Sequence, residues 1–134
     1  MKNVTIKELE DLATKIRINS IEAIRKVGAG HIGGSLSIVE LLAVLYGKQM
    51  VYDPENPQWE KRDRLVLSKG HAGPAWYSAL SAVGFFPEAW LWTLNEGGTK
   101  LPSHPDRRKT PGVDATTGSL GQGTSLAAGI ATGL

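Results

Sequence analysis

The chain has 134 residues, of which 41% are hydrophobic, enough for one domain with its own core and too few for a multidomain enzyme. Fifteen Lys and Arg residues oppose 13 Asp and Glu residues, and a net charge of only +2 implies no nucleic-acid and no membrane partner. No apolar signal core or stretch of ~20 apolar residues occurs, which argues against secretion and membrane insertion. Cysteine is absent, which excludes disulfides and thiolate chemistry and fits a cytoplasmic location.

Two helices are predicted in the first third of the chain. Thr5 and Glu8 form a capping box ahead of apolar residues that recur with a helical period, which predicts a long first helix over residues 6–27. Ser37 and Glu40 repeat the capping signature before a run that is apolar on nearly all sides. The second helix is therefore expected to begin there and to be well buried.

The next elements are shorter. Residues 64–68 form a β-branched and aliphatic run bounded by glycine, which is typical of a buried parallel strand. Helices are expected over residues 74–83 and 87–95. Residues 97–118 are rich in Gly, Pro, Thr and charge without any period, which predicts a long surface or active-site loop. The small residues of 123–134 predict a final, tightly packed helix.

This order of elements predicts an α/β fold in which helices surround a parallel sheet. A sheet covered on both faces needs several strands, and the sequence offers one. The last helix also stops at Leu134 without a basic final turn or a capping residue. We therefore expect residues 1–134 to be an incomplete part of one domain, with the other strands beyond Leu134.

A glycine-rich turn over residues 118–123 precedes the last predicted helix. Its permissive backbone and the amides of a positive helix end are suited to phosphate. The same glycines are also compatible with a tight turn that only lets the helix pack closely. The turn by itself leaves both interpretations open.

Three histidines stand beside glycine or proline in predicted loops or element edges, at His31, His71 and His104. A single histidine is more often structural, and the wide spacing of these three matches no compact metal motif. Imidazole donates hydrogen bonds to phosphate and hydroxyl oxygens and exchanges protons near neutral pH. Together with the glycine-rich turn, the histidines therefore predict a site for a phosphorylated, hydroxylated carbon skeleton.

Four blocks of the sequence, taken in order, resemble the transketolase family. They are residues 30–37, 63–72, 102–106 and 112–123, and the resemblance spans nearly the whole chain. The blocks look closest to the amino-terminal subunits of split transketolases. The synthase of 1-deoxyxylulose 5-phosphate shares the first block, whereas the His104-Pro105 pair favours transketolase.

The resemblance implies a thiamine-diphosphate cofactor and transfer of a two-carbon ketol unit between sugar phosphates. In such an enzyme the cofactor supplies the carbon chemistry, and the protein supplies orientation, proton transfer and electrostatics. By position, the resemblance implies catalytic, substrate-facing roles for His31 and His104, and cofactor contacts from His71, Gly118, Ser119 and Leu120.

Two parts of the family pattern are missing from the chain. The Mg²⁺-binding block, Gly-Asp-Gly followed by an Asn, has no equivalent up to Leu134, so no metal ligand is expected before that residue. The glutamate that activates the aminopyrimidine belongs to the family's second domain. We therefore expect the chain alone to be inactive and to work with a carboxy-terminal transketolase subunit or domain in a homo- or hetero-oligomer. A deoxyxylulose phosphate synthase-like enzyme and a non-catalytic assembly fragment are the alternatives.

Overall fold

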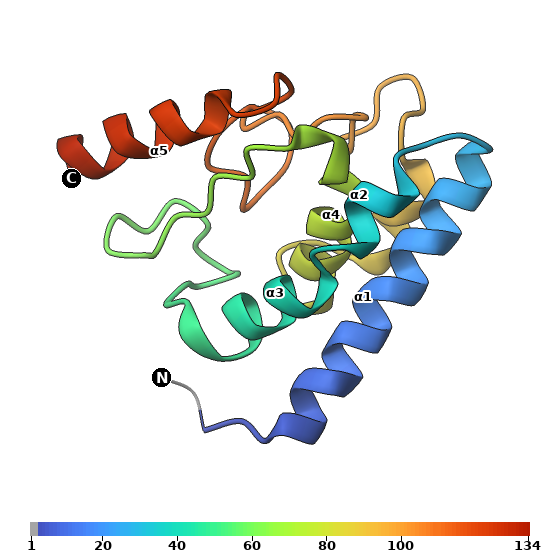
Figure 1. Ribbon diagram of the computed structural model, residues 1–134, viewed down its shortest axis with the longest axis horizontal. Coiled ribbons are helices and arrows are strands. Elements are labelled where there is room, and N and C mark those ends of the chain that lie inside the picture. Colours follow the sequence, from blue (N-terminus) through green and yellow to red (C-terminus); the bar gives the residue numbers. More distant parts are fainter. Residues whose placement is uncertain (1–2) are drawn as a thin grey trace.

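The computed structural model describes residues 3–134. Helices gather around a central helix, α4, while long loops cover one end of this body (Figure 1). None of the helices among residues 3–134 is both long enough and apolar enough to cross a bilayer. The α-helices are α1 (Ile6–Val27), α2 (Ile32–Leu36), α3 (Val39–Val44), α4 (Gly73–Ala82) and α5 (Gln122–Gly133), with a π-helical turn at Leu45–Gln49 and 3-10 helices at Gly70–Ala72 and Glu88–Thr93.

The prediction for α1 is confirmed at both ends. Thr5 Oγ1 accepts a hydrogen bond from the amide of Glu8 at 3.2 Å, and Glu8 Oε2 accepts one from the amide of Thr5 at 2.8 Å. The helix ends at Gly28, whose φ of 81° is left-handed and suits a helix terminus. Its apolar face, with Ile16 and Ala23 buried, packs against α3 and α4.

The core is centred on α4, which is buried from Gly73 to Leu80. Trp76 is fully buried, and its Nε1 donates to Tyr46 Oη at 2.6 Å, so the indole N–H is satisfied inside the core. Ser20 of α1 and Ser78 of α4 are also fully buried, and their hydroxyl oxygens lie 3.2 Å apart. The paired hydroxyls join the two helices where neither could reach water.

The predicted capping box of Ser37 and Glu40 is wrong. Ser37 ends α2 instead of starting α3, and its hydroxyl donates to the carbonyl oxygen of Gly34 at 3.2 Å. The residue that precedes α3 is Ile38, which makes no side-chain cap. The expectation of a well-buried helix is met only on one face, since Val39, Leu42 and Ala43 are buried whereas Leu41 is 57% exposed and Val44 is 37% exposed.

The other predicted helices are present with adjusted bounds. The helix expected over 74–83 is α4, and the one expected over 123–134 is α5, which extends away from the helical body in Figure 1. The tight packing expected of that last helix is wrong, because Gly123 is the one residue of α5 that is buried. The segment 87–95 is a shorter 3-10 helix, because the backbone leaves helical geometry at Leu94 and adopts a φ of 62° at Asn95. Residues 97–118 contain neither helix nor strand, as predicted.

The predicted parallel sheet is not found, because residues 3–134 contain no β-strand. A strand requires a neighbouring strand that takes up its backbone hydrogen bonds. In residues 64–68 these groups bind a loop instead. The amide of Leu65 donates to Asp114 Oδ2 at 3.0 Å, and the carbonyl oxygen of Leu67 accepts from Thr117 Oγ1 at 2.6 Å. The predicted strand is thus a segment that holds the loop after residue 112.

Candidate functional site

The three histidines, far apart in the sequence, meet at one place. His31 immediately precedes α2, His71 lies in the 3-10 helix Gly70–Ala72, and His104 lies in the long loop. The ring of His71 makes edge-on contacts with both other rings, with centroid distances of 4.7 Å and interplanar angles of 86°. We call these three side chains the histidine cluster.

The cluster has the electrostatic properties of a binding site. His71 Nδ1 is buried and has no hydrogen-bond partner among the described residues, and an orphaned polar atom of this kind is costly unless a ligand or water satisfies it. Burial lowers the pKa of His104, and the neighbouring His71 and His31 lower that pKa further. At neutral pH the imidazole of His104 is therefore mostly uncharged and able to accept a proton.

Two glycines let the backbone segments of the site come into contact. A side chain at Gly70 would overlap the Thr117 carbonyl, since its Cβ would lie 2.7 Å from the carbonyl carbon. A Cβ at Gly73 would lie 3.1 Å from the carbonyl oxygen of Ser103 and 3.2 Å from Pro105 Cδ. Gly70 therefore contacts the segment that leads into the glycine-rich turn. Gly73 contacts the residues on both sides of His104.

We expect Gly70→Ala to destabilise the protein by about 1–3 kcal/mol, the usual cost of overpacking a well-packed contact. The added methyl group meets backbone at Thr117, which cannot move aside as a flexible side chain can. The measurement is the urea midpoint of the full-length protein. Gly97→Ala is the matched control, because a Cβ at that position meets nothing within 4 Å. Equal midpoints for the two variants would contradict the close contact.

The glycine-rich turn lies against this cluster. A Cβ at Gly118 would lie 4.0 Å from His104 Cδ2, while Ser119 and Leu120 are exposed, Leu120 by 72%. Fewer backbone amides at the start of α5 are available to bind a ligand than the sequence predicted. The amide of Gly121 donates to Ser68 O at 3.2 Å, and that of Gln122 donates to Ser119 O at 3.3 Å.

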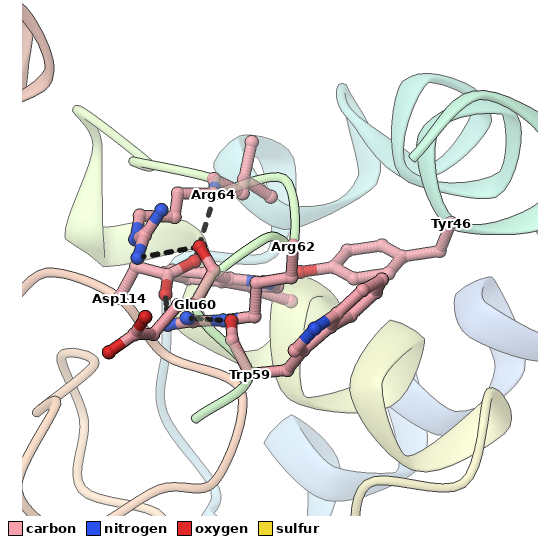
Figure 2. Close-up of polar contacts among 8 residues, drawn as sticks. Tyr46, Trp59, Glu60, Arg62, Arg64 and Asp114 are labelled. Carbon is pink, nitrogen blue, oxygen red and sulfur yellow. Dashed lines mark hydrogen bonds and ion pairs between the residues drawn. The ribbon is translucent and has the colours of Figure 1, made fainter. Parts of the chain in front are cut away.

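An ion pair that is mostly buried fixes the loop at Asp114. Arg62 and Asp114, whose side chains are 11% and 7% exposed, bind each other, and Figure 2 shows them pointing toward one another. Arg62 Nη1 also donates to the carbonyl oxygen of Trp59 at 2.9 Å. Asp114 accepts in addition from the amide of Leu65, so one carboxylate joins the segment before His71 to the segment before Gly118.

Lys69 fixes the segment that follows His31. Its Nζ donates to the carbonyl oxygen of Gly34 and to Ser37 Oγ, at 2.8 Å in each case. Sequence reasoning assigned no role to Lys69 or to Asp114. A signal was present for both: each is a charged residue inside a block of small and polar residues that otherwise carries the site.

A hollow larger than the cavity at the histidine cluster lies elsewhere in the described chain. It has a volume of about 530 Å³ between α1 and α3 and is lined by residues such as Leu9, Ala13 and Val44. A cavity of about 50 Å³ beside His31 and His71 is far smaller. We assign the site to the histidine cluster, because the larger hollow is lined by no histidine and by no residue of the glycine-rich turn. Its titratable residues are Glu10, Arg17 and Glu40, and Glu40 is already paired with Arg17. Among residues 3–134, no three His, Cys, Asp or Glu side chains are grouped so that they could hold a metal ion.

Comparison with known proteins shows the family of this chain. The family described as transketolase, thiamine diphosphate binding domain, matches residues 9–133, and the chain belongs to this family. The 6-deoxy-6-sulfo-D-fructose transketolase subunit of a Clostridium species is 59% identical over 124 residues, which are 92% of this chain and 45% of that protein. One of the apulose-4-phosphate transketolase subunits of Actinobacillus succinogenes is 41% identical over 131 residues, 96% of this chain and 47% of that protein.

Solved structures agree with the family. A transketolase from Leishmania mexicana superimposes with a TM-score of 0.88 at 35% identity, over 92% of this chain and 18% of that one. A transketolase from Campylobacter jejuni gives a TM-score of 0.87 at 35% identity, over 96% and 20%. The chain thus spans less than half the length of these relatives.

Proposed function

We propose that this chain is the amino-terminal portion of a transketolase, which moves a two-carbon ketol unit between sugar phosphates when assembled with the remaining part of the enzyme. The observation that carries the proposal is the histidine cluster against the Gly118 turn, in a chain of the thiamine-diphosphate-binding family. Imidazoles that bind hydroxyl and phosphate oxygens and exchange protons suit such substrates.

The cofactor fits the residues that are present. His71 Nδ1 is a buried atom without a partner among the described residues. The Gly118 turn lies beside the cluster, and the nearest atom to a Cβ at Gly118 would be His104 Cδ2 at 4.0 Å. We assign the contacts with the cofactor to His71, Gly118, Ser119 and Leu120. The bound thiamine would supply the carbon nucleophile of the reaction. The residues named here would orient the cofactor and compensate the charge of its diphosphate.

The two other histidines face the substrate in this proposal. His31 is exposed at the rim of the cluster, and His104 is partly buried with a lowered pKa. We infer that His104 holds and returns a proton at a sugar hydroxyl, and that His31 donates a hydrogen bond to a neighbouring oxygen of the sugar. An uncharged imidazole at neutral pH is the form that accepts the proton.

A magnesium ion does not fit the described residues, which offer no grouped metal ligands. We therefore assign its ligands to sequence beyond residue 134, and the glutamate that activates the aminopyrimidine to a carboxy-terminal subunit or domain. On this proposal the 134 residues alone are inactive, and the working enzyme is an oligomer. We place it in the cytoplasm, because charged sugar phosphates are retained inside cells.

A second donor is worth testing because of one relative. The relative with 59% identity is named for 6-deoxy-6-sulfo-D-fructose, whereas the relative with 41% identity is named for apulose 4-phosphate. We propose that ketoses ending in either a phosphate or a sulfonate are candidate donors. Both are anions, and a positively charged group elsewhere in the assembly would bind the end of either molecule.

The test is a coupled transfer assay with the full-length protein, its carboxy-terminal partner, thiamine diphosphate and Mg²⁺. We expect two-carbon transfer from a ketose phosphate or from 6-deoxy-6-sulfo-D-fructose to an aldose phosphate. A folded assembly that leaves both donors untouched at saturating cofactor would reject the transketolase assignment. The synthase-like and non-catalytic alternatives would then stand.

A further inference from the structure

The position of His31 depends on a helix that is weak by itself. Helix α2 has five residues, two of which are the glycines Gly33 and Gly34, and short helices rich in glycine are unstable without tertiary contacts. Its buried residue is Ser35, and His31 makes no side-chain cap to it. The position of the His31 ring beside His71 therefore depends on the tertiary contacts that hold α2 against α1, α4 and the turn of His71.

Lys69 links the turn of His71 to the end of α2. Its backbone carbonyl accepts from the amide of Ala72 at 2.9 Å and so starts the 3-10 turn that carries His71. Its ammonium group reaches back to the end of α2 through the bonds to Gly34 and Ser37. A cation that binds the last carbonyls of a helix is favourable, because the helix carboxyl end is partially negative.

We propose that Lys69 is a positioning residue: by binding the end of α2 while starting the turn of His71, it holds the His31 ring in edge contact with the His71 ring. Ser37 contributes as the second acceptor: its O–H donates to the Gly34 carbonyl, which leaves the lone pairs of Oγ to accept from the ammonium group. The structural part of this proposal is independent of the reaction, whereas its effect on turnover rests on the proposed function.

The experiment compares Lys69→Met, Lys69→Arg and Lys7→Met in the full-length protein assembled with its partner. Lys7 pairs with Asp11 on the far end of α1 with its side chain 75% exposed, so Lys7→Met makes the same charge change away from the site. Proximity of the His31 and His71 ring protons is measured by the nuclear Overhauser effect in a deuterated, histidine-protonated sample without cofactor. This readout does not require activity.

We expect Lys69→Met to lose the His31–His71 signal, and Lys69→Arg and Lys7→Met to retain it. In the transfer assay, kcat of Lys69→Met should fall about tenfold to a hundredfold, as for a reacting group misplaced by about 1 Å, with the apparent affinity for thiamine diphosphate within threefold. A retained signal in Lys69→Met, or its loss in both Lys69 variants, overturns the proposal.

The experiment also gives an answer if Lys69→Met does not fold or if the assembly is inactive. If Lys69→Met does not fold by circular dichroism, Ser37→Ala takes its place, because that change removes one acceptor and leaves the lysine; we expect a weakened ring signal, and an unchanged one overturns the proposal. If the unmodified assembly transfers no ketol unit, the proposed function fails. The ring signals still decide whether Lys69 positions His31.

Discussion

Asp114→Ala is expected to lower the free energy of unfolding by about 3–5 kcal/mol, the cost of breaking a buried ion pair by removing one partner. The loss leaves the Arg62 guanidinium, 11% exposed, without its counter-charge. It also leaves the amide of Leu65 without its acceptor. Urea unfolding of the full-length protein, followed by tryptophan fluorescence, measures the change.

Two further variants make this result specific. Glu22→Ala removes one partner of the Arg25 pair on the surface of α1, where the side chains are 42% and 73% exposed, and we expect little change there. The double variant Arg62→Met with Asp114→Leu should regain part of the loss, because no unpaired charge stays buried. If Asp114→Ala unfolds at the same urea concentration as Glu22→Ala, the buried pair does not hold the loop.

In the assembled enzyme, His104→Ala should lower kcat about 100-fold or more, the range for loss of a general acid–base group, with little change in cofactor affinity. His71→Ala should instead weaken the binding of thiamine diphosphate by about 1–3 kcal/mol, the cost of a charge-assisted hydrogen bond to phosphate. The difference arises because a proton-transferring group acts mainly in the transition state. Steady-state kinetics and calorimetric titration of the cofactor measure the two effects.

The conservative variant His104→Gln is the control for this division of roles. Glutamine can still form hydrogen bonds but does not exchange a proton near neutral pH. We expect it to retain cofactor binding and to have a kcat close to that of His104→Ala. If the alanine variants of His71 and His104 changed kcat and cofactor affinity in the same way, the proposed roles would be wrong.

The features that the sequence predicted well are those encoded by neighbouring residues. The capping box of Thr5 and Glu8 and the apolar period after it determine α1 locally, and both bounds were correct. Ser37 and Glu40 show the same local pattern, yet the Ser37 hydroxyl binds Gly34 and the ammonium group of Lys69. A tertiary contact, absent from any local pattern, decides which helix Ser37 belongs to.

The sequence singled out the residues of the candidate site but not their arrangement. The residue types around His31, His71 and His104 indicated exposed loops and proton exchange, and these loops do meet. Their meeting depends on long-range backbone contacts such as the one between Gly70 and Thr117, which sequence spacing does not encode. The predicted strand failed for a related reason, because its pattern describes burial and does not specify a partner strand.

The central place of His71 affects how measurements on this site should be read. Its ring contacts both other histidines, so replacing it changes the surroundings of His31 and His104 together. Residues in direct contact show coupling energies, and the effects of their single replacements do not add. The energy of the cluster is therefore a property of three rings jointly, and thermodynamic cycles that combine replacements are needed to divide it among them.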